Sequence, residues 1–178
     1  MSIQLDGAPV ISTERLRLRP PRPEDAPRIA ALANDEGVAK MTTRMPFPYG
    51  EEDARSFLAR CQDHDPRREQ VFAIEQDGSG LIGMLGFHPD EEGRTEVGYW
   101  LGRPYWGQGY ATEAADRALA WVSESWGRRY LMAGHFADNS ASGKVLCKTG
   151  FLYTGEVQPR HSLARGEPCP TRMMVWLA

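Results

Sequence analysis

The segment from Tyr99 to Ala115 constrains the fold most, because it places an apolar, strand-like stretch directly before a glycine turn and a helix. Gly107 and Gly109 lack a Cβ, so the backbone of this turn can approach a ligand closely. The free N–H groups in the first turn of a helix favour an anion. Small and apolar residues then recur at helical spacing: Ala111, Ala114, Ala115, Ala118, Val122 and Trp126. The segment therefore predicts a strand, an anion-binding turn and a helix packed against a sheet.

Two nucleotide-binding motifs that also use glycine turns do not fit. The dinucleotide fingerprint needs a third Gly or Ala three residues after the second glycine, and Gly109 is followed there by Thr112. A phosphate-binding P-loop needs Gly-Lys followed by Ser or Thr, but Gly143 and Lys144 are followed by Val145. Neither motif explains the turn.

The segment resembles the acetyl-CoA signature of the GNAT superfamily of N-acetyltransferases, Gln/Arg-x-x-Gly-x-Gly/Ala, with Gly107 and Gly109 as its glycines. The first position of the signature falls on Pro104, and Arg103 stands one residue early, so the chain departs from the pattern there. The sequence Tyr-Trp-Gly-x-Gly-Tyr-Ala-Thr-Glu-Ala is most similar to the branch containing the ribosomal-protein alanine N-acetyltransferases RimJ and RimL. Residues 11 to 19 resemble the opening strand of that branch.

A second motif, Asn139-x-x-Ser142 ending in Gly150-Phe151, is similar to the second cofactor segment of the same family. The alternative interpretation is that Asn139 only caps a short helix whose first turn Ser142 closes. Together the two motifs imply a set of acetyl-CoA contacts. The set is Trp100, Leu101, Trp106, Gly107, Gln108, Gly109, Tyr110, Ala111, Thr112, Asn139, Ser142 and Lys148.

The resemblance also implies candidates for catalysis. Acetyl transfer to an amine needs a neutral amine, a stabilised oxyanion and a proton for the departing thiolate. Glu96 is the implied general base, with an ion-paired glutamate of no kinetic role as the alternative, and His135 or the substrate itself as the base in that case. Ser142 is the implied acid, because Leu146 stands near the position where many members carry a tyrosine. The backbone N–H of Trp100 or Leu101 would bind the oxyanion.

The order of predicted elements is that of an α/β (α+β) protein with a GNAT-like fold. We expect a mixed, mostly antiparallel sheet of about seven strands with helices on both faces, splayed between its fourth and fifth strands. The expected strands are 13–19, 70–76, 81–88, 95–101, 130–137, one that starts at Phe151, and 173–177. The expected helices are one with Glu24 and Asp25 at its start and a buried stripe from Ala26 to Ala33, one from Glu51 to before Pro66, the central helix after Gly109, and 140–149, with 34–49 mostly irregular. A single domain covers residues 1–178.

Composition excludes several classes of function. A net charge of −3 provides no basic surface for nucleic acid or an anionic membrane. The three cysteines and four histidines fit neither a disulfide framework nor a metal-ligand spacing, so no metal is expected. Residues 1–9 lack the features of a secretory signal, and no stretch approaches the roughly 20 apolar residues of a membrane span. A cytoplasmic location is expected.

The expected function is acetyl-CoA-dependent transfer of an acetyl group to a primary amine by direct attack on the thioester. The acceptor is left open between a protein N-terminal amine, an amino acid, a polyamine and an aminoglycoside. A non-catalytic acyl-CoA-binding or regulatory module is the alternative from another class. We expect a monomer or a homodimer.

Overall fold

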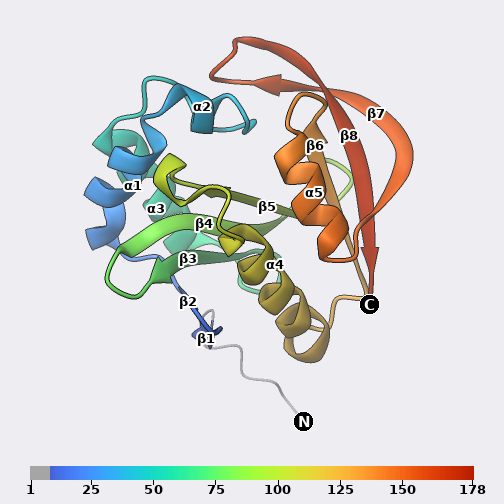
Figure 1. The fold of residues 1–178 in the computed structure, drawn as a ribbon, viewed down its shortest axis with the longest axis horizontal. Helices are drawn as coiled ribbons and strands as arrows, with labels where there is room; N and C mark the ends of the chain where they lie inside the picture. Colours follow the sequence, from blue (N-terminus) through green and yellow to red (C-terminus); the bar gives the residue numbers. More distant parts are fainter. Residues whose placement is uncertain (1–8) are drawn as a thin grey trace.

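The computed structural model describes residues 9–178, so nearly all of the segment inspected for a secretory signal lies outside the described residues. These residues form one open sheet in the order β1-β2-β3-β4-β5-β6-β8-β7 (Figure 1). Neighbouring strands are antiparallel except β5 and β6, which are parallel. The strands are β1 (Ile11–Ser12), β2 (Leu16–Arg19), β3 (Gln70–Gln76), β4 (Gly80–Pro89), β5 (Thr95–Leu101), β6 (Tyr130–Phe136), β7 (Leu152–Ser162) and β8 (Glu167–Leu177). The mixed α/β sheet is as expected, with β1 making eight strands instead of about seven.

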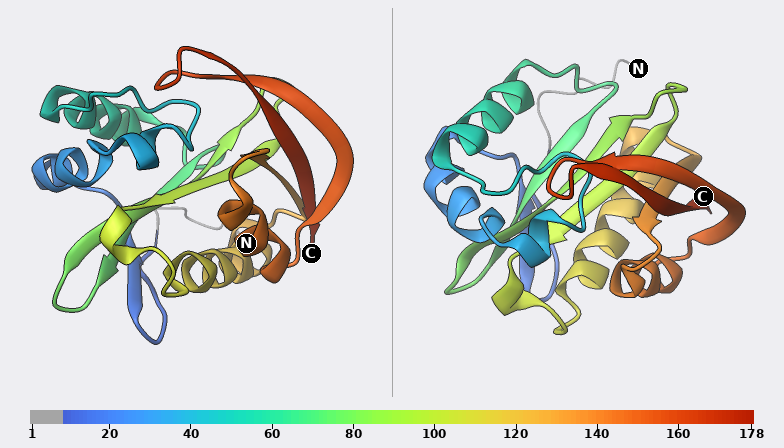
Figure 2. Two further views of the ribbon diagram at one scale, coloured as in Figure 1. Left: turned by 45° about the horizontal axis from the view of Figure 1, so that its top comes forward. Right: turned by 90° about the horizontal axis from the view of Figure 1, so that it is seen from above.

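Helices cover both faces of this sheet, as Figure 2 shows. One face carries α1 (Ala26–Ala33), α2 (Glu36–Ala39) and α3 (Glu51–Asp63), and the other carries α4 (Tyr110–Trp121) and α5 (Ser140–Lys148). The helix α2 lies in a segment expected to be irregular. It forms because the Asp35 side chain accepts hydrogen bonds from the N–H groups of Gly37 and Val38, which caps its first turn.

Each face of the sheet buries its own hydrophobic cluster. Alternation along β4 sends Leu85 and Phe87 toward α4 and Met84 toward α1 and α3. On the α4 side, Phe72 meets Trp121 edge-on at 5.4 Å between ring centroids. Ala114, Ala115 and Ala118 of α4 are buried against the sheet, as their small size predicted. The helix that follows the glycine turn is therefore packed rigidly against the sheet.

The sheet is split between β5 and β6. Within residues 9–178 these two strands are paired at one position, Glu96 with Met132, after which they diverge (Figure 1). The expected splay between the strands at 95–101 and 130–137 is confirmed. Backbone groups of β5 beyond this point are free to face a ligand.

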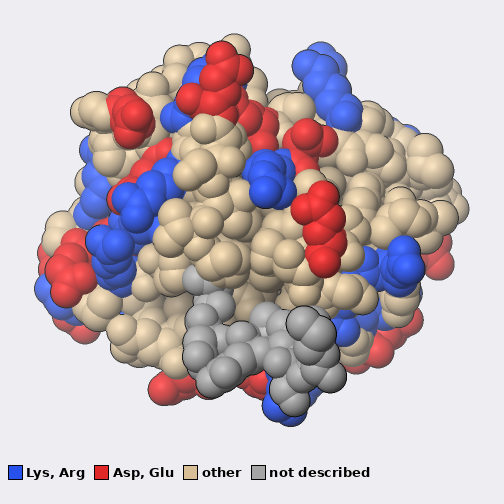
Figure 3. Space-filling model, turned by 90° about the horizontal axis from the view of Figure 1, so that it is seen from below, with Lys and Arg blue, Asp and Glu red and all other residues tan. Residues whose placement is uncertain are grey.

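The described residues show neither a surface of one charge sign in the view of Figure 3 nor a membrane-spanning helix or a group of metal ligands. Figure 3 shows Lys and Arg side chains mixed with Asp and Glu side chains on one face of the molecule. None of the helices in residues 9–178 is both long enough and apolar enough to cross a membrane. Across the same residues, no three His, Cys, Asp or Glu side chains are grouped so that they could hold a metal ion.

Candidate active site

A cleft of about 1060 Å³ lies at the splay between β5 and β6. Its walls come from β4, β5 and β6, from the 41–49 segment after α2, from the glycine turn and from the first turns of α5. Of the twelve residues predicted to contact acetyl-CoA, all but Gln108 line this cleft. The structure thus brings together two motifs that lie about 30 residues apart in the chain, as the sequence predicted for a shared ligand site.

The glycine turn has the backbone that its sequence demands. Gly107 and Gly109 have φ values of 71° and 82°, a region that side chains with a Cβ rarely adopt. The Arg15 guanidinium donates to the carbonyl of Gln108 at 2.9 Å and pairs with Glu113 on α4 at 2.7 Å. The Gln108 amide turns back and donates to the Pro104 carbonyl at 2.9 Å. These contacts fix the backbone of the turn.

The departure from the family signature before the turn has a structural counterpart. Arg103 is directed to Asp35 at the start of α2, to which its Nε donates at 2.6 Å, and its guanidinium lies over the Trp106 ring, 5.0 Å from the centroid. This ion pair joins the segment before the glycine turn to the α2 side of the cleft. A role of Arg103 in cofactor binding therefore has no support in its contacts.

The second motif is organised around Asn139 and Ser142. The Asn139 side chain accepts from the N–H of Ser142 at 3.2 Å, so Asn139 does cap the helix α5. The Ser142 hydroxyl lies 2.9 Å from the hydroxyl of Tyr99, which reaches it from β5. Burial raises the pKa of Tyr99 to about 12, although the hydrogen bond with Ser142 acts in the opposite direction. Tyr99 is therefore a neutral phenol beside Ser142, and the sequence analysis did not single it out.

Glu96 is buried, with 7% of its surface exposed, and it is ion-paired. Its two carboxylate oxygens accept from the two terminal nitrogens of Arg160 on β7, at 2.5 and 2.9 Å. The hydrogen bonds to Glu96 raise the pKa of the Arg160 guanidinium. The pair sits where β5 and β6 part and ties β5 to the far side of the splay. This geometry matches the ion-paired alternative, and a role of Glu96 as base stays a prediction.

His135, named as an alternative base, has both ring nitrogens engaged. Its Nδ1 lies 2.8 Å from the Phe136 carbonyl and its Nε2 lies 2.9 Å from the hydroxyl of Tyr153. The imidazole is buried against α5, where a Cβ on Gly143 would come within 2.8 Å of Nε2. His135 therefore has no free nitrogen for a substrate in this arrangement.

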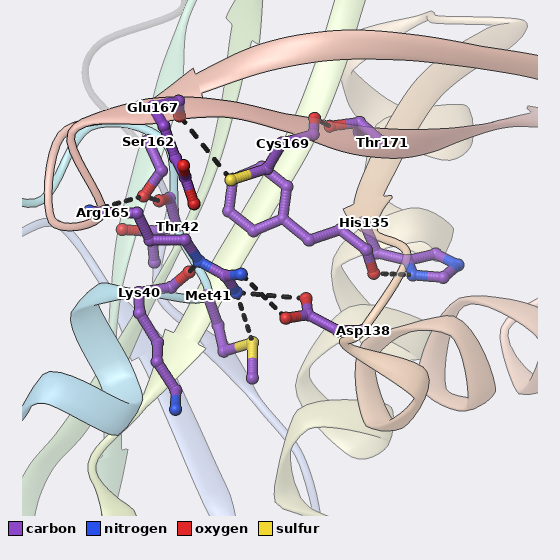
Figure 4. A network of polar contacts seen from close by, with 11 residues as sticks. Lys40, Met41, Thr42, His135, Asp138, Ser162, Arg165, Glu167, Cys169 and Thr171 are labelled. Carbon is purple, nitrogen blue, oxygen red and sulfur yellow. Dashed lines mark hydrogen bonds and ion pairs between the residues drawn. The ribbon is translucent and has the colours of Figure 1, made fainter.

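The tip of the β7–β8 hairpin reaches across the outer end of the cleft to the segment after α2 (Figures 1 and 4). We call this set of contacts the hairpin clasp. Arg165 donates to the Lys40 carbonyl at 2.8 Å and pairs with Asp138 at 2.7 Å. Nearby, the Ser162 hydroxyl donates to the Thr42 carbonyl at 3.3 Å. The clasp joins three segments that are distant in the chain.

Comparison with known proteins supports the interpretation of both motifs. A family model described as "Acetyltransferase (GNAT) domain" matches residues 15–152. The uncharacterized N-acetyltransferase YoaA of Bacillus subtilis is 31% identical over 93% of this chain and 94% of its own. Two solved structures share the fold. RimJ of Mycobacterium smegmatis, in complex with a CoA disulfide, has a TM-score of 0.82 at 22% identity, over 96% of this chain and 88% of that one. The microcin C7 self-immunity acetyltransferase MccE, in complex with acetyl-CoA and AMP, has a TM-score of 0.80 at 19% identity, over 93% and 94% of the chains. The chain belongs to the GNAT family of acetyltransferases.

Proposed function

We propose that the protein transfers the acetyl group of acetyl-CoA directly to a primary amine, with a protein N-terminal amine as the first acceptor to test. The observation that carries this proposal is the single cleft shared by the glycine turn, the free edge of β5 and the first turn of α5. Its volume of about 1060 Å³ is at the upper end of the usual range for small-molecule sites, roughly 300–1,000 Å³. One cleft of this size supports simultaneous binding of both substrates.

Direct transfer is further supported by the state of the cysteines. An acetyl-enzyme route would need a reactive thiolate in the cleft. Cys61 is the cleft-lining cysteine among the described residues, and burial raises the pKa of its thiol to about 12. Cys147 is exposed on α5 and does not line the cleft. A protonated, shielded thiol favours attack by the amine itself.

The predicted site residues fit defined roles in this reaction. We expect the pyrophosphate of acetyl-CoA at the glycine turn, and the thioester carbonyl near the backbone N–H of Trp100 or Leu101. Ser142, hydrogen-bonded to the neutral phenol of Tyr99, remains the candidate donor of a proton to the departing thiolate. Glu96 remains the candidate base predicted from the sequence.

A small-molecule amine is the second candidate acceptor, because the hairpin clasp covers part of the outer cleft. RimJ and MccE share the fold, but their identity to this chain is too low to transfer an acceptor from either one. A cytoplasmic location and a monomeric or homodimeric state also remain predictions.

The test is an acceptor screen combined with a binding measurement. Thiol release from acetyl-CoA would be followed with peptides, amino acids, polyamines and aminoglycosides, and products identified by mass spectrometry. Matched peptides with a blocked N-terminus are the control. Acetyl-CoA at about 100 times its Kd should stabilise the fold by about 2.7 kcal/mol, a rise of roughly 5–10 °C in Tm. If acetyl-CoA raises the Tm but none of the amines causes thiol release from acetyl-CoA, the non-catalytic module would be favoured instead.

A further inference from the structure

The cleft contains an imidazole that neither motif includes. His88 lies on β4 directly opposite Glu96 on β5, in the antiparallel register that also pairs Gly86 with Gly98. Residues directly opposite in antiparallel strands have Cβ atoms about 4.5–5.5 Å apart and point to the same face. His88 and Glu96 are therefore neighbours, and both line the cleft.

The ring of His88 lies over Gly98. Its Cε1 is 3.7 Å from the position that a Cβ on Gly98 would occupy. Gly98 precedes Trp100 and Leu101, one of which is expected to supply the N–H that binds the oxyanion. The imidazole is thus close to the segment where the thioester carbonyl is expected, on the face of β5 that also carries Glu96 and Trp100.

The two neighbours differ in how free they are to take a proton. Both oxygens of Glu96 are held in a bidentate pair by Arg160, and protonation would give up part of that pair. His88 has no hydrogen-bond partner within residues 9–178. A partly exposed ring without a partner can contact an incoming amine, directly or through one water.

We propose that the His88 imidazole accepts the proton that the acceptor ammonium must lose before it attacks the thioester, a role that rests on the proposed acetyl transfer. The amine nitrogen then forms the C–N bond and the C–S bond breaks. The nitrogen loses its second proton to solvent, and the imidazolium later releases the first. Ser142 gives its proton to the thiolate and takes one back from solvent, so one proton in total passes to solvent. Glu96 then acts as a positioning residue that, together with Arg160, holds β5 at the splay and favours the imidazolium.

The charges around His88 suit a base at neutral pH. Burial lowers its pKa below the ordinary value, and Arg44 and Arg160 act in the same direction, whereas Glu96 and Glu69 raise it. Arg44 comes from the segment after α2, Arg160 from β7 and Glu96 from β5, and Glu69 directly precedes β3. Burial and the two arginines therefore favour the neutral imidazole, which is the form that can accept a proton.

The test compares kcat/KM across pH for the wild type, His88→Gln and Glu96→Gln with an acceptor from the screen. A positioned base contributes roughly 10²- to 10⁴-fold, so His88→Gln should lose at least about 100-fold while acetyl-CoA affinity stays within about twofold. His88→Ala should recover activity when imidazole is added. Glu96→Gln should keep an acid limb but move it to lower pH, because it removes a negative charge that favours the imidazolium.

The control is His161→Gln, which replaces an exposed histidine on β7 outside the cleft and should leave the pH profile unchanged. The acetyl-CoA Kd of each variant verifies that it is folded. An active wild type with His88→Gln retaining kcat/KM within about threefold at all pH values would overturn this inference alone. A wild type that binds acetyl-CoA but acetylates no amine would overturn the proposed function, and this inference with it.

Discussion

Replacing Gly107 with alanine should weaken acetyl-CoA binding much more than it destabilises the fold. Gly107 has a φ of +71°, and a Cβ built on it meets no other atom within 4 Å. The unliganded fold therefore bears only the backbone strain of the left-handed region, about 1–2 kcal/mol. For a chain of this size, that strain lowers Tm by roughly 2–8 °C.

The bound state should lose more. A phosphate that packs against the Gly107 backbone would collide with the new methyl group and lose one charge-assisted hydrogen bond from the turn. Such a bond contributes about 1.5–3 kcal/mol, which corresponds to roughly 10- to 150-fold weaker binding. Gly109 is less suitable for this test, because its Cβ would lie 3.3 Å from the Arg15 guanidinium and disturb the turn itself.

The matched control is Gly127→Ala at the opposite end of the same helical segment. Gly127 has a φ of +73° and equally open surroundings, so the strain is comparable, but it does not line the cleft. Calorimetric titration with acetyl-CoA and thermal melts would be measured for both variants. If Gly107→Ala binds acetyl-CoA as tightly as Gly127→Ala does, the glycine turn does not carry the pyrophosphate.

Three further predictions follow from contacts in and around the site. Asn139→Ala should cost about 1 kcal/mol in chemical denaturation, as a lost cap does, and also raise the acetyl-CoA Kd; unchanged affinity would leave Asn139 as a cap only. Tyr99→Phe and Ser142→Ala should each lower kcat, and the double variant should be no slower than the worse single one, whereas additive losses would mean that they act separately. Burial raises the pKa of Asp25, but its bonds with Arg19 outweigh this and lower it overall. The Asp25–Arg19 ion pair therefore stabilises the fold fully above about pH 4, and this stabilisation is lost as pH falls through the lowered pKa of Asp25. Asp25→Asn should lower the free energy of unfolding by about 3 kcal/mol at neutral pH. It should also make that free energy depend less on pH in the acid range.

Local sequence patterns predicted most of the fold. The strands β3 and β5 match their expected bounds, and the helix α1 contains the expected stripe from Ala26 to Ala33, because alternation and helical spacing mark these elements. The strand β8 begins at Glu167, six residues before the expected start at Met173. Pro168 and Pro170 argued against a strand in this part of the sequence, because proline cannot donate a hydrogen bond to a neighbouring strand. The strand β1 has only two residues and carries no pattern to recognise.

The residues of the glycine turn and of the Asn139 segment that line the cleft could be predicted because they lie in two short motifs with fixed spacing. The partners of the catalytic candidates could not. Arg160 is 64 residues from Glu96, and Ser142 is 43 residues from Tyr99, so each contact depends on how β5, α5 and β7 are arranged in space. His88 is one of four histidines in the sequence, and only the β4–β5 register places it beside Glu96.

The hairpin clasp has a consequence for the rate at which substrates enter. The two walls of the cleft share a single backbone pair between β5 and β6, so the sheet alone does not fix the width of the opening. Arg165 and Ser162 fix it through bonds to carbonyls 125 and 120 residues away along the chain. A bulky amine must wait for these bonds to break, whereas a slender one can enter while they are intact. Two acceptors of equal affinity for the open cleft would then be acetylated at different rates, so that selection among amines is exerted through association kinetics.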